Sequence, residues 1–272
     1  MDQTLFTLPF GGFNGYVIAA GFAMARMTGM IIVMPAFTRL GLTGILQAAV
    51  ALVLAFPLVP MLVQSFADQH LVVTTTTAVL LLKEVTVGLV IGLVLGVPFW
   101  AAEAAGDVLD LQRGSTSAGL MDPLSTASES ISGTLFGLVM VALYYGSGGL
   151  MLTLRVVYDS YGLWPVGRLL PLFSASAGQF VIGLLENVVT MGLMLGAPLV
   201  VCLLLTDLVL ALVSRAAPNL NVFALSMGAK NLVFALMLVL YCAFLIKYMG
   251  GNLESLLTAR HQLEAIAPTT QQ

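Results

Sequence analysis

The chain has 272 residues, of which 59% are hydrophobic and 8% charged, with a net charge of −3 and a mean hydropathy of +1.03. A soluble domain carries about 25% charged residues, so this composition excludes a soluble globular fold and predicts an integral membrane protein. A membrane-spanning helix needs about 20 apolar residues, and the length therefore allows about six spans. No basic run points to a nucleic acid as partner.

Apolar stretches predict an all-α fold of helical hairpins, in which prolines break about six long helices. The first helix is expected over residues 15–34, where it ends before Pro35. The second is expected over 42–63, where Pro57 and Pro60 bend or end it, because proline removes a helical hydrogen bond and clashes with the preceding turn. A polar connection leads to the third helix, over 78–102.

The third predicted helix carries glycine at three successive four-residue steps, Gly88, Gly92 and Gly96. This spacing places the glycines along one face, where another helix backbone can approach closely. Glycine that merely dilutes an apolar helix is the alternative interpretation.

Residues 103–133 concentrate charges and glycines that are scarce elsewhere in the chain. Gly106 and Gly114 have access to backbone angles that are closed to other residues, and Pro123 blocks the continuation of a helix. We expect this segment, which lies inside a helical domain over 1–249, to line or plug a polar passage. The residues assigned to this role are Gly106, Asp107, Gln112, Arg113, Gly114, Ser115, Asp122 and Pro123.

Three further helices are predicted, over 131–157, 178–213 and 222–249. The aromatic cluster Tyr158, Tyr161 and Trp164 is typical of a belt at a membrane interface, and Pro198 is expected to kink or divide the fifth helix. The polar tail 250–272 is predicted to contain a short amphipathic helix.

Two heptapeptides, 92–98 and 192–198, share their glycines, two leucines and a final proline, and an aspartate follows each proline by nine residues. Two related helix units, each interrupted by proline, would explain the match and would border a passage. Chance similarity in a chain so rich in glycine and leucine is the alternative.

Several charges fall in or near apolar stretches, where an unpaired charge costs about 2.5–3.5 kcal/mol. Asp207 and Lys230 lie equally far from the expected turn near Pro218, so we predict that they pair, alone or in a network with Arg215. Arg26 has no such partner in its own hairpin. The candidates are Glu84, Glu186 or another subunit, and structural pairing is preferred over contact with a substrate.

The segment after the third helix resembles a known signature. Ala105-Gly106-Asp107, Leu111-Gln112, Gly114, Ala118 and Asp122-Pro123, together with Asp207, the run from Arg215 to Phe223, Met227 and Lys230, are similar to the export-gate family of flagella and virulence injectisomes. The resemblance covers essentially the whole chain and is strongest to the injectisome T subunit, the counterpart of the flagellar R subunit. Asp107 stands where flagellar relatives often have glutamate.

This resemblance implies a non-enzymatic subunit of the type III secretion export apparatus in the bacterial inner membrane, projecting to the periplasmic side. Implied partners are the R-type and S-type subunits (flagellar P and Q counterparts), the switch autoprotease, the export-gate channel subunit, membrane lipid and unfolded proteins in transit. No cofactor is expected, because no phosphate loop, metal cluster or nucleophile–base set is visible. The alternatives are a secondary transporter of a small solute, a scaffold that does not contact a pore, and a flagellar export gate.

Overall fold

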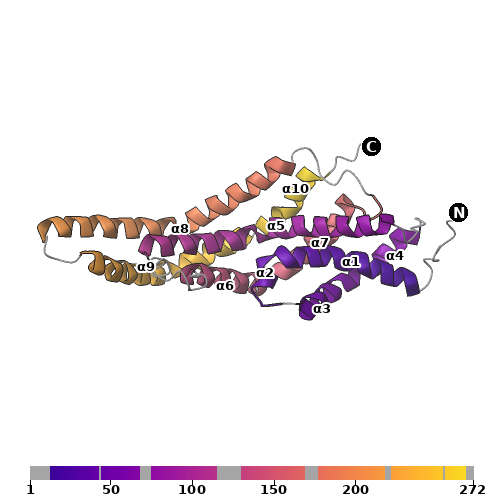
Figure 1. Ribbon diagram of the computed structural model, residues 1–272, viewed down its shortest axis with the longest axis horizontal. Helices are drawn as coiled ribbons and strands as arrows, with labels where there is room; N and C mark the ends of the chain where they lie inside the picture. The colour runs from indigo at the N-terminus through magenta and orange to yellow at the C-terminus, as the bar shows by residue number, and fades with distance from the viewer. Residues whose placement is uncertain are drawn as a thin grey trace. The chain divides into compact units, whose positions relative to one another are not determined.

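The computed structural model describes residues 13–42, 44–67, 75–114, 130–168, 177–217, 222–253 and 255–267. Every regular element in these ranges is a helix (Figure 1), which confirms the all-α fold. The elements are α1 (Phe13–Val33), α2 (Pro35–Thr38), α3 (Gly44–Ala55), η1 (Phe56–Leu58), α4 (Val59–Ala67), α5 (Thr75–Arg113), α6 (Ile131–Gly146), α7 (Gly149–Leu163), α8 (Ala177–Ala216), α9 (Val222–Leu253) and α10 (Ser255–Ile266).

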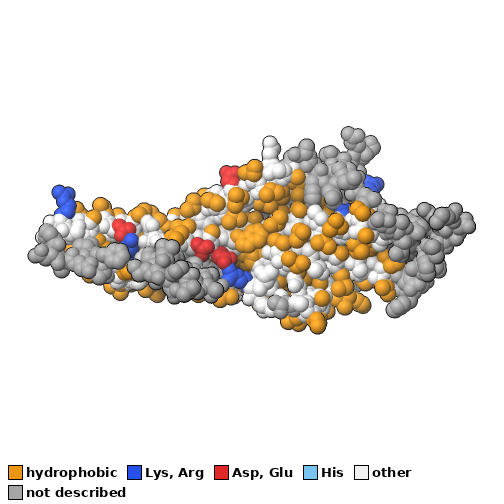
Figure 2. Space-filling model, in the orientation of Figure 1, with side chains coloured by type: hydrophobic (Ala, Val, Ile, Leu, Met, Phe, Trp, Pro, Cys, Tyr) orange, Lys and Arg blue, Asp and Glu red, His pale blue; other side chains and the backbone are white. Residues whose placement is uncertain are grey.

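Within the described ranges, five helical segments are long and apolar enough to cross a membrane, and α6 with α7 would make a sixth. These segments agree with the predicted number of spans. Apolar side chains cover much of the described surface on the face shown in Figure 2, and charged side chains appear there only in small groups. The chain thus has the surface of a protein whose helices meet lipid or other apolar helices.

The chain divides into two compact units. The first comprises residues 1–96, 148–183 and 256–272, and the second comprises 97–147 and 184–255. In the first unit α1 packs against α3 and α4, beside which it lies in Figure 1. In the second unit α6 packs against α9.

Glycines allow the close helix contact that their spacing predicted in α5. A Cβ added at Gly92 would lie 2.8 Å from the carbonyl oxygen of Met30, and one added at Gly88 would overlap the carbonyl of Arg26. Both positions confirm that the α1 backbone approaches this face of α5. In the second unit Gly192 plays the same part, since its Cβ would lie 2.9 Å from the carbonyl oxygen of Ala101.

Prolines have different effects at different places. α1 ends before Pro35, as predicted, and a short 3-10 helix over Phe56–Leu58 interrupts the second predicted helix at Pro57. Pro98 and Pro198, in contrast, lie inside the continuous helices α5 and α8. The expected division of the helices at these prolines is therefore wrong, and a kink at Pro198 stays a prediction. Each proline leaves one backbone hydrogen bond of its helix unmade, and α8 packs closely on α5 nearby, at Gly192 and Ala101.

The third predicted helix ends eleven residues too early, because α5 continues to Arg113. Residues 103–113 are mostly alanine, leucine and charged residues with few helix breakers, which favour continuation. The helix ends where Gly114 takes a left-handed backbone angle, φ +77°, the usual conformation after a helix C-terminus. Gly106, predicted to need unusual backbone angles, is instead helical.

The fourth predicted helix is two helices. α6 ends at Gly146 and α7 begins at Gly149, with Gly148 at φ +79°. A left-handed residue cannot continue a right-handed helix, so the local sequence Gly-Ser-Gly-Gly produces the break. The aromatic cluster that follows is not a surface belt, because Tyr161 and Trp164 are buried in the first unit.

The tail helix α10 has the amphipathic pattern that was predicted for this stretch. One side of the helix is buried, and it consists of Leu256, Ala259, Leu263 and Ile266. On its polar side Arg260 Nη1 lies 3.2 Å from Asp159 Oδ2 of α7. The tail is thus packed on the first unit.

Candidate functional site

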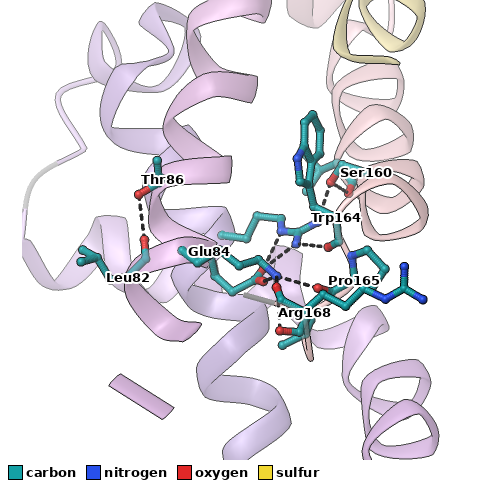
Figure 3. A network of polar contacts seen from close by, with 11 residues as sticks. Leu82, Glu84, Thr86, Ser160, Trp164, Pro165 and Arg168 are labelled. Atoms are coloured by element: carbon teal, nitrogen blue, oxygen red, sulfur yellow. Dashed lines mark hydrogen bonds and ion pairs between the residues drawn. The ribbon is translucent and has the colours of Figure 1, made fainter. Parts of the chain in front are cut away.

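Within the described ranges, charged side chains are buried in two polar clusters, one in each unit. The first surrounds Arg26, whose side chain is fully buried on α1. Its guanidinium meets Glu84 of α5, with Nε 2.7 Å from Oε2, and donates to Ser160 Oγ and the carbonyl oxygen of Trp164, each at 2.8 Å. The guanidinium also lies 3.7 Å above the ring centroid of Tyr161. Figure 3 shows how α1, α5 and α7 converge here.

Lys83 adds a second cation beside Glu84. Its Nζ lies 3.0 Å from Glu84 Oε1, but this oxygen accepts no aligned hydrogen bond, so the contact is an ion pair. The ammonium donates instead to the carbonyl oxygens of Pro165, Val166 and Arg168, at 2.6, 3.2 and 3.1 Å. Lys83 thereby fixes the chain that leaves α7, a role that was not predicted.

The first cluster confirms the pairing of Arg26 with Glu84, one of its candidate partners. Two cations and one carboxylate are buried together, and backbone carbonyls and a hydroxyl supply the remaining acceptors. Buried charges persist where such partners compensate for lost solvation. The cluster therefore connects three helices, α1, α5 and α7.

The second cluster lies at the C-terminal end of α5 and contains part of the predicted passage segment. Asp110, which is buried, accepts hydrogen bonds from Ser130 Oγ at 2.8 Å, from Ser132 N at 2.9 Å and from Ser132 Oγ at 2.7 Å. Arg113 also pairs with Asp110 and donates to Ser132 Oγ at 3.0 Å. We call Asp110, Arg113, Ser130 and Ser132 the Asp110 clamp.

The Asp110 clamp joins the end of α5 to the start of α6. Ser130 is the N-cap of α6, and its Oγ accepts from Gly133 N at 2.8 Å. An added Cβ at Gly106 would overlap the backbone of Ser132 and Gly133. Gly106 is thus needed for close packing rather than for an unusual backbone angle. A sequence signal for the clamp did exist, because the serine at 130 precedes an apolar helix as an N-cap does.

The α8–α9 hairpin contacts the same end of α5. Lys230 Nζ lies 2.7 Å from Asp207 Oδ1 and donates to the carbonyl oxygen of Gln112 at 3.1 Å, which confirms the predicted pair. The guanidinium of Arg113 lies 3.9 Å above the ring centroid of Phe234. Four helices of the second unit therefore meet around residues 110–113.

The other predicted residues are distributed as follows. Asp107 lies exposed on α5, with its Oδ1 against Gly133, and Gly114 ends the helix. Arg215 is exposed near the end of α8, and no interaction joins it to the Asp207–Lys230 pair within the described ranges. Ser115, Asp122 and Pro123 lie outside the described residues. Among the residues the structure does describe, no group of three His, Cys, Asp or Glu could hold a metal ion.

The long apolar helices and their buried ion pairs define a multi-pass helical membrane protein. Residues 17–256 match the family model described as bacterial export proteins, family 1. The chain belongs to this family.

Curated relatives come from both branches of the family. The chain is 32% identical over 222 residues to "Yop proteins translocation protein T" of Yersinia pestis, covering 80% of this chain and 84% of the relative. It is 30% identical to "Secretion system apparatus protein SsaT" of Salmonella typhimurium, covering 84% of this chain and 88% of the relative. It is 29% identical to "Flagellar biosynthetic protein FliR" of Bacillus subtilis, covering 64% of this chain and 67% of the relative.

Proposed function

We propose that this chain is a non-enzymatic subunit of a type III secretion export apparatus of the injectisome branch. With the R-type and S-type subunits it forms the gated pore through which unfolded proteins cross the bacterial inner membrane. The observation that carries the proposal is the 32% identity to a translocation protein over 80% of the chain. The injectisome branch is supported because the relatives from Yersinia pestis and Salmonella typhimurium share more of their length with this chain than the flagellar relative from Bacillus subtilis does.

The polar clusters support a role as a framework rather than as a catalyst. Their charged groups pair with one another or with backbone carbonyls, so they stabilise helix contacts. Unfolded chains of many sequences have to pass an export pore, and strong specific binding would hold them back. Small residues such as Gly114, Ser115 and Gly119 would offer only weak contacts.

We further propose that Gly106–Pro123 contributes to a plug that closes the resting pore. In support, the Asp110 clamp and the α8–α9 hairpin hold the C-terminal end of α5 in place. The segment that begins at residue 114 is therefore attached to a fixed helix end. The clamp also fixes residue 130, where the chain enters α6. A plug needs such fixed ends if a small change between them is to open a passage.

The function is tested by removing the gene from its bacterium and measuring secretion of substrate proteins into the medium. Loss of secretion, restored by the gene supplied on a plasmid, is expected, together with co-purification of tagged R-type and S-type subunits. The purified single chain in liposomes should take up no solute. Solute uptake by the single chain would overturn the proposal in favour of a secondary transporter.

The plug is tested separately by replacing residues 114–119 with a flexible Gly-Ser sequence of equal length. The assembled complex should then conduct ions at rest, measured as current across a planar bilayer. An assembled variant with unchanged resting conductance would show that the segment does not close the pore.

A further inference from the structure

One carboxylate on α8 has no partner in the described part of the chain. Glu186 is exposed, and neither a hydrogen bond nor an ion pair joins it to any residue in the described ranges. It was a candidate partner of Arg26, but Arg26 is satisfied by Glu84. Glu186 therefore needs a different explanation.

The surroundings of Glu186 are apolar and equally uncovered. Leu185, Val189 and Leu193 are 65%, 50% and 54% exposed, and they recur every four residues beside the carboxylate. Such a row forms one of the ridges through which helices pack against each other. We call Leu185, Glu186, Val189 and Leu193 the Glu186 face.

The side of α8 that adjoins the Glu186 face is already occupied by the chain itself. Leu184, Leu195 and Leu199 are buried, and Gly192 packs closely on Ala101 of α5. The helix consequently has one side committed to its own unit and one side open. The Glu186 face is the part of the open side that carries an exposed carboxylate.

Neither water nor lipid alone is a favourable environment for the Glu186 face. Water would leave a ridge of large aliphatic side chains hydrated, which is unfavourable in proportion to their exposed area. Lipid would cover these side chains but would strand an ionised carboxylate in hydrocarbon. Both needs are met by a protein surface that is apolar and presents one cation opposite the carboxylate.

We propose that the Glu186 face is the docking surface for an apolar helix of a neighbouring membrane subunit, which carries one Lys or Arg at the level of Glu186. The four-residue spacing of the ridge favours a helix as the partner element. The carboxylate favours a partner side chain with a positive charge. The inference rests on the proposed function in one respect, namely that this chain assembles with other export-gate subunits. It adds where one of them binds and what chemistry the partner helix carries.

The test is co-expression of the full chain with tagged R-type and S-type subunits, with the assembled fraction measured on native gels. Glu186→Leu should lower that fraction at least tenfold, because the partner cation loses its counter-ion inside the interface. Glu186→Lys should lower it further, and Glu186→Asp should lower it least. If the face meets lipid alone, Glu186→Leu will assemble as well as the wild type or better, which overturns the proposal.

Asn187→Leu provides the matched control, because it makes a similar gain in apolar surface at the neighbouring exposed position. Assembly of this variant should be retained, and an equal loss would show that the charge is not what matters. The isolated Glu186→Leu chain should unfold at the wild-type temperature, since Glu186 touches no described polar group. A lower unfolding temperature would overturn the proposal by assigning Glu186 to the fold.

The partner cation is identified by rescue. Each Lys or Arg in the apolar helices of the tagged subunits is changed to Glu in combination with Glu186→Lys, and one combination should restore assembly. Rescue only by a change within this same chain would identify a second copy as the occupant and overturn the proposal. If the wild-type chain recovers no tagged subunit, the proposed function fails. If it assembles and Glu186→Leu assembles equally, only the docking surface fails.

Discussion

Arg26 and Glu84 lie 58 residues apart in the sequence, and their side chains meet at 2.6 Å with neither exposed. The same guanidinium reaches Ser160 and the carbonyl of Trp164. One arginine thus holds together α1, α5 and the end of α7, and its charge is acceptable there only while Glu84 remains ionised beside it.

Glu84→Gln should lower the free energy of unfolding by about 3–5 kcal/mol, because it leaves two buried cations without a counter-ion. Equilibrium unfolding of the purified chain in detergent measures the change. Thr86→Val, two residues away on the same helix, removes only an exposed hydrogen bond to Leu82 and should stay within about 0.5 kcal/mol. A loss below 1 kcal/mol for Glu84→Gln would contradict the importance of the pair.

Gly88→Ala should destabilise the chain by about 1–3 kcal/mol, since the new methyl group would overlap the carbonyl of Arg26 and force α1 away from α5. Gly21→Ala is the matched control, because nothing lies within 4 Å of its added Cβ. That control should stabilise the helix by about 0.5–1 kcal/mol. Thermal unfolding of both variants checks the opposite signs, and equal effects would contradict the close contact.

Reversing either charge of the Asp207–Lys230 pair should weaken the α8–α9 hairpin, and reversing both should recover part of the loss. The expected coupling is about 0.5–1 kcal/mol, because Asp207 is 41% exposed and partly screened. Recovery stays incomplete, since an aspartate at position 230 cannot donate to the carbonyl of Gln112. A double-mutant cycle measures the coupling, and strictly additive losses would argue against the pair.

Asp110→Asn should loosen the join between α5 and α6. The substitution removes the negative charge that four hydrogen-bond donors share, and each charge-assisted hydrogen bond contributes about 1.5–3 kcal/mol. We expect hydrogen exchange of the Ser132 and Gly133 amides to rise at least tenfold. Ser214→Ala, which removes an exposed hydroxyl on α8, should leave these amides unchanged. Unchanged exchange in Asp110→Asn would show that the clamp does not hold α6.

Arg260→Ala should raise the pKa of Glu264 on α10. In the folded chain the hydrogen bond from Arg260 lowers the pKa of this carboxyl from its ordinary value of 4.5. The interaction is therefore fully present above pH 4.5 and is lost as the pH falls through the lowered pKa. NMR titration of the Glu264 carboxyl carbon measures the shift. Identical titration in the variant and the wild type would contradict the contact.

Sequence reasoning predicted what depends on composition and short-range spacing. The apolar stretches, the glycine steps at Gly88 and Gly92 and the pairing of Asp207 with Lys230 were all visible, because each follows from a helix repeat or from a hairpin's symmetry. The continuation of α5 and α8 through Pro98 and Pro198 was not visible in the sequence. Whether a proline breaks a helix depends on the tertiary packing around it, which one sequence does not contain.

The networks of buried polar groups could be predicted only in part. Glu84 was a candidate for Arg26 because both are charged, whereas Ser160 and the carbonyl of Trp164 are ordinary groups more than 130 residues away. The Asp110 clamp similarly depends on Ser130 and Ser132, two serines within a run of small polar residues. Apart from Ser130, which precedes an apolar helix as an N-cap does, these uncharged partners carry no distinctive signal until the fold brings them together.

The Arg26 cluster has a consequence for how the chain is made. Ribosomes add about 5–20 residues per second, so Arg26 leaves the ribosome about 3–12 seconds before Glu84, which follows 58 residues later. Ser160 follows 134 residues after Arg26. During biogenesis the insertion machinery therefore has to shelter a lone guanidinium until two later helices arrive to enclose it.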